Sequence, residues 1–157
     1  MNFVDDIFEE FACAFIGRVK GADEIAEKRK LNRKRLDFSV DSLHVVDDYL
    51  LVLHERHDQG KLDAKGDQLA VLRGGAYLGE VIRRNSDEQW HWVDYDEYMP
   101  SHPELRVTMT QKTVATCAFL RAADDSMIMP PNRINRLLED GAHMSTHAFA
   151  AQLGRLR

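Results

Sequence analysis

Glu80 is the acidic residue whose sequence context points most directly to chemistry. It follows the segment Ala-Tyr-Leu-Gly (76–79) and precedes Val81, so its carboxylate is expected to lie among buried groups. A buried carboxylate has to be paired or neutralised. We expect a structural partner, which is Arg83, Arg84 or a strand N–H group. The alternative is a carboxylate that binds a ligand or transfers protons together with a histidine.

Two pairs of histidines have spacings close to those of metal ligands. His54 and His57 lie three residues apart, whereas the zinc proteases with a His-Glu-x-x-His motif need a spacing of four. His143 and His147 do lie four apart, but Ser145 between them is typical of a helix N-cap, which would take the pair off one regular helix. The sequence therefore predicts no metal site at either pair.

The chain shows no clear nucleophile and no phosphate-binding loop. Cys13 and Cys117 lie in apolar runs, where nothing nearby favours a thiolate. The glycine-rich segment 74–79 lacks the Gly-Lys-Ser/Thr ending and the preceding strand of a phosphate-binding loop. We therefore expect a protein that is not an enzyme and has no cofactor.

The segment 86–104 combines charge of one sign with large aromatic side chains. It contains six acids, no Lys or Arg, and four Trp or Tyr residues. Aromatic side chains with a rim of acids make a suitable contact surface for a basic protein, because opposite charge speeds the encounter. We predict a partner-binding face formed by Asp94, Tyr95, Asp96, Glu97 and Tyr98. Trp90 and Trp92 alternate on one face of a strand and are expected to cover the edge of the core.

Composition excludes several classes of function. The 157 residues include 21 Lys and Arg against 26 Asp and Glu, a formal net charge of −5, which argues against general nucleic-acid binding. No apolar run approaches the ~18 residues that span a bilayer. The acidic N-terminus differs from the basic start of a secretory signal, and two distant cysteines are typical of reduced thiols. We expect a cytoplasmic protein without a nucleic-acid or membrane partner.

Positive charge is concentrated in the segment 28–35, whose sequence is Lys-Arg-Lys-Leu-Asn-Arg-Lys-Arg. Such a run is a solvated helix end, a nucleic-acid patch or a localisation signal. No aromatic residue lies among these cations, so a surface for stacking bases is disfavoured. We favour the solvated helix end.

Hydrophobic periodicity predicts three helices in the first half, at residues 2–20, 37–58 and 67–85. The first carries four phenylalanines, with Asp5, Asp6, Glu9 and Glu10 assigned to its other face. That apolar stripe is expected to pack into the core or against a partner, and a second copy of the chain in a homodimer is one such partner. Ser39 or Asp41 is expected to cap the second helix and Asp67 the third. Gly75 and Gly79, four residues apart, predict the close approach of another backbone.

The second half changes to strands and then returns to helices. Strands are expected at 89–93, 105–109 and 113–121, with a short edge strand at 127–129, and helices at 132–140 and 145–153. This order predicts an α+β fold in which N-terminal helices pack on a small antiparallel sheet of three or four strands, with C-terminal helices. The whole chain, 1–157, is expected to form a single domain.

Three segments together resemble a family of small, uncharacterised bacterial α+β domains. They are residues 36–50, which begin Leu-Asp-Phe-Ser-Val-Asp-Ser-Leu; residues 74–85, which contain Gly-x-Tyr-x-Gly-Glu-Val and are followed by Trp90; and residues 127–141, which contain Met-Pro-Pro-Asn-Arg. The resemblance covers about 36–150 and leaves 1–35 as an N-terminal helical extension. Six residues of this region are expected to be structural or possible ligand contacts: Gly75, Tyr77, Gly79, Glu80, Trp90 and Trp92.

Some members of that family are immunity proteins encoded near bacterial toxins. The resemblance therefore implies a non-enzymatic, protein-binding module, such as a toxin-neutralising immunity protein with a basic toxin as partner. The alternative is a small ligand-binding or hydrolytic enzyme that uses Glu80 with a histidine.

Overall fold

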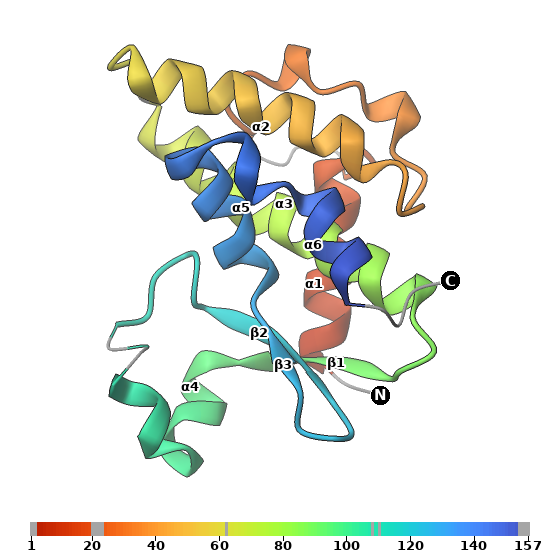
Figure 1. The fold of residues 1–157 in the computed structure, drawn as a ribbon, viewed down its shortest axis with the longest axis vertical. Helices are drawn as coiled ribbons and strands as arrows, with labels where there is room; N and C mark the ends of the chain where they lie inside the picture. Colours follow the sequence, from red (N-terminus) through yellow and green to blue (C-terminus); the bar gives the residue numbers. More distant parts are fainter. Residues whose placement is uncertain (1–2, 20–23, 62, 108, 110, 154–157) are drawn as a thin grey trace.

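The computed structural model places most of the helices together, with one small sheet beneath them (Figure 1). It describes residues 3–19, 24–61, 63–107, 109 and 111–153. The main elements are α1 (Phe3–Phe15), α2 (Leu43–Asp58), α3 (Ala64–Asn85), β1 (Trp90–Asp94), α4 (Tyr95–Tyr98), β2 (Ala118–Ala122), β3 (Met127–Ile128), α5 (Pro130–Asp140) and α6 (Thr146–Gln152). Short 3-10 turns are η1 (Lys28–Lys30), η2 (Arg33–Arg35), η3 (Met99–Ser101), η4 (Pro103–Val107) and η5 (Ala142–Met144). The predicted α+β class is confirmed.

The sheet is an antiparallel meander in the order β1-β2-β3. Trp90 pairs with Ala122 and Trp92 with Leu120, so both tryptophans lie on one face, as their alternation predicts. That face is buried; α1 contacts β1, α5 contacts β2, and Gly79 of α3 lies against Trp92 of β1. The predicted same-face placement of the two tryptophans is therefore confirmed.

Two of the expected strands are wrong in extent. The segment predicted as a strand at 105–109 lies mostly in η4, which begins at Pro103; Thr108 falls outside the described residues. The strand predicted at 113–121 shortens to β2, because the Thr113 N–H donates to Thr116 Oγ1 at 2.8 Å and closes a turn there. Local polar side chains offer the backbone an alternative to a strand ladder.

Several helix ends also shift from their expected positions. α1 ends at Phe15, and Gly17 follows with a φ of 82°. The N-cap of α2 is Ser42 instead of the expected Ser39 or Asp41, because the Ser39 hydroxyl accepts the Ser42 N–H at 3.2 Å and closes a turn just before the helix. α3 begins at Ala64 because Asp63, not Asp67, accepts the Gly66 N–H at 3.1 Å.

The C-terminal helices begin with clear start signals. α5 starts at Pro130 instead of Asn132, since proline suits the first position of a helix. Ser145 caps α6 as predicted, and its Oγ accepts the Ala148 N–H at 3.1 Å.

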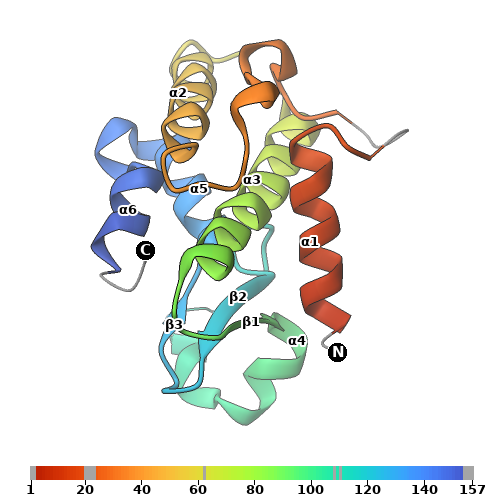
Figure 2. The ribbon, with the colours of Figure 1, turned by 90° about the vertical axis from the view of Figure 1, so that its right-hand side faces the viewer.

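The apolar stripe of α1 is buried within its own chain. Phe8 and Phe15 are 5% and 0% exposed, and α1 packs along α3 and against β1 (Figure 2). Phe3, at the helix start, is exposed. The apolar stripe on which the homodimer was predicted is therefore covered by α3 and β1 of the same chain. No helix in the described ranges is both long and apolar enough to cross a membrane.

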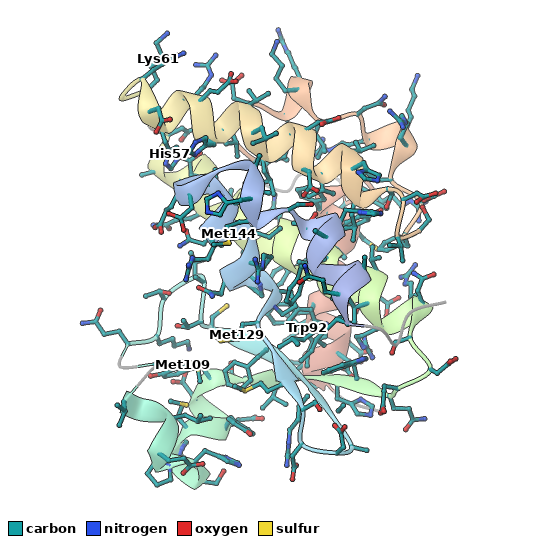
Figure 3. All side chains as sticks on the ribbon, viewed as in Figure 1. His57, Lys61, Trp92, Met109, Met129 and Met144 are labelled. Atoms are coloured by element: carbon teal, nitrogen blue, oxygen red, sulfur yellow. The ribbon has the colours of Figure 1, made fainter. Side chains whose placement is uncertain are left out.

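α3 lies at the centre of the helices, and its glycines let neighbours approach closely. A Cβ atom at Gly75 would lie 2.5 Å from the Cα of Pro131, so the predicted close approach of a backbone is confirmed there. A Cβ at Gly79 would lie 2.1 Å from the ring of Trp92, so at this position the close neighbour is a side chain. Trp92 is labelled in Figure 3.

Tyr77 of α3 supplies a polar contact inside the core. Its hydroxyl accepts the Phe38 N–H at 3.0 Å and lies 2.6 Å from Ser42 Oγ. Burial raises the pKa of Tyr77, so the residue stays a neutral phenol. These bonds tie the chain before α2 to α3, which gives Tyr77 a structural role.

A second, smaller apolar cluster holds the described residues of the segment 95–109, which we call the acidic lobe. Tyr98, Met99 and Met109 bury Phe119 on the outer face of β2. The lobe projects away from the helices at the lower end of the molecule, where Met109 is labelled (Figures 1 and 3).

Two alanine substitutions in α3 test the seat of Trp92. Gly79→Ala should lower the free energy of unfolding by about 1–3 kcal/mol, because the new methyl group collides with the ring. Gly74→Ala is the matched control, since its Cβ would meet Phe15 at an ordinary 3.5 Å and the helix propensity of alanine is better by up to ~1 kcal/mol. Urea unfolding measures both. A Gly79→Ala variant as stable as wild type would show that the Trp92 ring does not pack on residue 79.

Candidate functional site

The site is built around Trp92, Gly79 and Glu80, where β1 crosses α3. The Trp92 ring covers Gly79 and stacks on Phe8 with the ring centroids 4.2 Å apart. Its indole Nε1–H donates to Glu80 Oε2 at 3.2 Å. Glu80 is 2% exposed, as its sequence context predicts.

Arg83 is the partner of Glu80, so the predicted ion pair is confirmed. Its Nη1 donates to Glu80 Oε2 at 2.8 Å, and its Nε donates to the Trp90 carbonyl at 3.0 Å. Its Nη2 lies 3.2 Å from Asp5 Oδ2. One guanidinium thus contacts two buried carboxylates and one strand carbonyl.

Asp5 belongs to the site as well, although the sequence did not predict it there. The sequence predicts Asp5 on the polar face of α1, yet it is only 7% exposed. Its Oδ1 accepts the Trp92 backbone N–H at 2.6 Å, and its Oδ2 lies 2.9 Å from His91 Nδ1. The spacing of Asp5 to Phe8, Ala12 and Phe15 places it on the buried stripe, and this signal was available in the sequence.

A cavity of about 590 Å³ opens beside this cluster. Four acids line it, against two arginines, Arg83 and Arg84; the acids are Glu9, Glu80, Asp87 and Glu88. His91 also lines it, and its side chain is 55% exposed. His91 borders a second cavity of about 300 Å³ near Arg121 as well. The lining is therefore acidic on balance and suits a cationic group.

The chemistry of this arrangement is limited to charge recognition and proton transfer. Asp5 orients the His91 ring through Nδ1, which leaves Nε2 as the second ring nitrogen of an exposed side chain. Ser86 lines the cavity, but its Oγ accepts the Glu88 N–H at 3.1 Å and the Trp90 Nε1–H at 3.2 Å. It therefore acts as a local cap.

The other histidines have separate partners. His54 Nδ1 lies 2.8 Å from the Leu138 carbonyl, and His57 Nε2 lies 2.7 Å from Asp67 Oδ2. The structure does not bring these two rings together on one site. His147 lies beside His44 of α2, with ring centroids 3.8 Å apart.

The cysteines lie apart from this cluster. Cys13 and Cys117 are both half-buried and unpaired as thiols. Burial raises the pKa of the Cys117 thiol, which makes the reactive thiolate scarcer.

The predicted partner-binding face is only partly exposed. Tyr98 is 9% exposed and packs edge-on against Phe119, so its place on that face is corrected. Asp94 caps α4 by accepting the Asp96 N–H at 3.1 Å, and Tyr95 donates its hydroxyl to the Met109 carbonyl. Asp96 and Glu97 are exposed.

One basic residue from outside the segment reaches this face. Lys112 Nζ lies 2.5 Å from Asp96 Oδ2, and both side chains are largely exposed. An exposed pair of this kind contributes ~0–1 kcal/mol and is weakened by salt. Glu97 is therefore the better probe of the surface charge.

Arg83→Met tests the electrostatic role of the bridging arginine. It should lower the free energy of unfolding by about 3–5 kcal/mol, since two buried carboxylates lose their common cation. Adding Asp5→Asn and Glu80→Gln should recover part of the loss. Arg84→Met is the control, because that guanidinium lies 3.8 Å from the half-exposed Glu9 and 3.7 Å over the Phe38 ring, and the loss of both contacts should cost only about 1–2 kcal/mol. Equal losses in the two single variants, measured by urea unfolding, would refute the bridging role.

Comparison with models of known protein families, with curated proteins and with solved structures finds no match to this chain. The resemblance to small bacterial domains and the role in toxin neutralisation therefore stay predictions.

Proposed function

We propose that this chain is a non-enzymatic protein-binding module that meets a basic partner at its acidic end. The acidic end comprises the surface of the acidic cavity and of the acidic lobe. Its exposed carboxylates come from three segments and are Asp6, Glu9, Asp87, Asp96, Glu97 and Glu104. The single observation that carries the proposal is a cavity of about 590 Å³ whose lining holds four acids against two arginines.

The shape of the cavity adds specificity to the charge. A lysine or arginine side chain from a partner could enter it and approach Glu80, which already accepts from Arg83 and Trp92. Complementary charge at an interface speeds association and rejects partners of the wrong sign. The surface outside the cavity then acts mainly in steering.

The opposite end of the molecule supports this orientation. The turns η1 and η2 lie at the upper end in Figure 1, far from the acidic lobe. They expose Lys28, Arg29, Lys30, Lys34 and Arg35. A chain with charge of opposite sign at its two ends turns its acidic end towards a basic partner.

A toxin is a partner of the required chemistry. Enzymes that cleave nucleic acids need a positive surface for the phosphate backbone. An acidic protein that covers such a surface blocks the substrate. This is the form of partner that the resemblance to immunity proteins implies.

Charge reversal at the acidic end tests the proposal. The variant Asp6→Lys, Glu97→Lys, Glu104→Lys should weaken binding to a basic product of a neighbouring gene by at least about ten-fold, mainly through slower association at low salt. The control Asp48→Lys, Glu55→Lys, Glu139→Lys makes the same charge change at exposed sites on α2 and α5 and should leave binding nearly unchanged. Surface plasmon resonance at low and high salt gives both rates. Equal weakening in the two variants, or no binding by any neighbouring product, would contradict the proposal.

The Asp5–His91 pair favours one alternative function. An exposed imidazole oriented by a buried carboxylate at the edge of a cavity is suited to general base catalysis or to binding a small cation. The expected histidine partner of Glu80 is then His91, joined to it through Asp5 and Arg83. A thermal-shift screen of cationic metabolites tests this function, because a true ligand should raise the unfolding midpoint of wild type and not of His91→Ala.

A further inference from the structure

Three side chains of metal-ligand type meet where α2 and α6 begin. Asp41 precedes α2, His44 lies in its first turn, and His147 lies in the first turn of α6. One ligand atom from each lies within 4.8 Å of the other two. We propose that Asp41, His44 and His147 bind one divalent transition-metal ion of the Zn²⁺ type.

The separations of the three groups suit a shared ion. His147 Nε2 lies 4.0 Å from Asp41 Oδ1, which is too long for a hydrogen bond. Two ligands that each lie about 2.1 Å from one zinc ion are about 3.4 Å apart in tetrahedral geometry, so this pair has to close by about half an ångström when the ion binds. The imidazole rings of His44 and His147 are stacked, with centroids 3.8 Å apart and an interplanar angle of 21°, so one ring has to rotate before a nitrogen of each reaches the same ion. His44 is exposed, so its ring has room to rotate towards the ion.

Negative charge around the site offsets the partial positive charge of the two helix N-termini. The N-termini of α2 and α6 carry partial positive charge, which repels a cation. Asp47 neutralises the start of α6, since its carboxylate accepts the Thr146 N–H at 2.8 Å and the His147 N–H at 3.3 Å. The same bonds hold the backbone of His147 in place, and a fixed ligand loses less entropy when it binds metal. Asp48 adds a further exposed carboxylate on α2.

The donor set favours zinc over the hard cations. Two imidazole nitrogens and one carboxylate oxygen are common zinc ligands, whereas Mg²⁺ and Ca²⁺ prefer oxygen alone. Three protein ligands leave a fourth position for water, so the ion would remain accessible to other ligands. Bound metal would also join α6 to α2, which packs against it. The site lies apart from the acidic end and does not depend on the function proposed there.

Titration of the purified full chain with Zn²⁺ alone tests the site. Calorimetry should show one equivalent bound by wild type, and Co²⁺ should give an absorption spectrum of nitrogen and oxygen ligation. His44→Ala and Asp41→Asn should each lower the affinity by at least about ten-fold. Both side chains are exposed, so these variants should keep the unfolding midpoint of the metal-free protein. Zn²⁺ should raise that midpoint in wild type and not in His44→Ala.

Two other histidines provide matched controls. His143→Ala removes an exposed histidine four residues before His147, and His57→Ala removes one that lies beside Asp67. Both variants should bind Zn²⁺ as wild type does. The proposal is overturned by wild type that binds no stoichiometric Zn²⁺, by unchanged affinity in His44→Ala, or by an equal loss in His143→Ala.

Discussion

The position of Trp92 is the constraint on which the rest of the structure depends. Its ring occupies the space that any side chain at Gly79 would fill, and Phe8 closes the other side. Its two N–H groups reach Glu80 and Asp5, and Arg83 joins those two acids. The absence of one Cβ atom therefore fixes how β1 crosses α3. Because β1 leads directly into α4, the same contact sets where the acidic lobe begins.

The charged cluster also closes the outer edge of the sheet. β1 is an edge strand, and its Trp92 N–H and Trp90 carbonyl are taken by Asp5 and Arg83. The other edge, β3, is only two residues long. Filled or very short edges resist the addition of another strand. Recognition by this protein is therefore expected to use side chains and cavities instead of backbone pairing.

Sequence reasoning found the parts of this fold that have a local signal. The spacing of Gly75 and Gly79 predicted close packing on α3, and the alternation of Trp90 and Trp92 predicted one shared face. Asp5 was misplaced because acids in a first helical turn are usually solvated, although its spacing to Phe8 put it on the buried face. The other misplaced residues have a different cause.

The remaining errors concern contacts that only the folded chain creates. Tyr98 belongs to an aromatic and acidic stretch, yet Phe119 of β2 buries it. His147 was compared with His143, its neighbour in sequence, whereas its ring lies against His44 from a distant helix. No periodicity or spacing in the sequence reports a pairing across so many residues. The ion pair of Glu80 was found because its partner lies three residues away on the same helix.

The buried cluster of Asp5, Glu80 and Arg83 and the proposed binding surface both carry an excess of negative charge. Asp5 and Glu80 carry two formal negative charges, and Arg83 supplies one positive charge between them. The excess lies next to the cavity, where a cation from a partner could balance it without displacing Arg83 from the Trp90 carbonyl. A ligand that binds only the folded chain stabilises it. Occupation of the cavity by a basic side chain should therefore tighten the contact of α1, α3 and β1, so that recognition at the surface and stability of the core rise together.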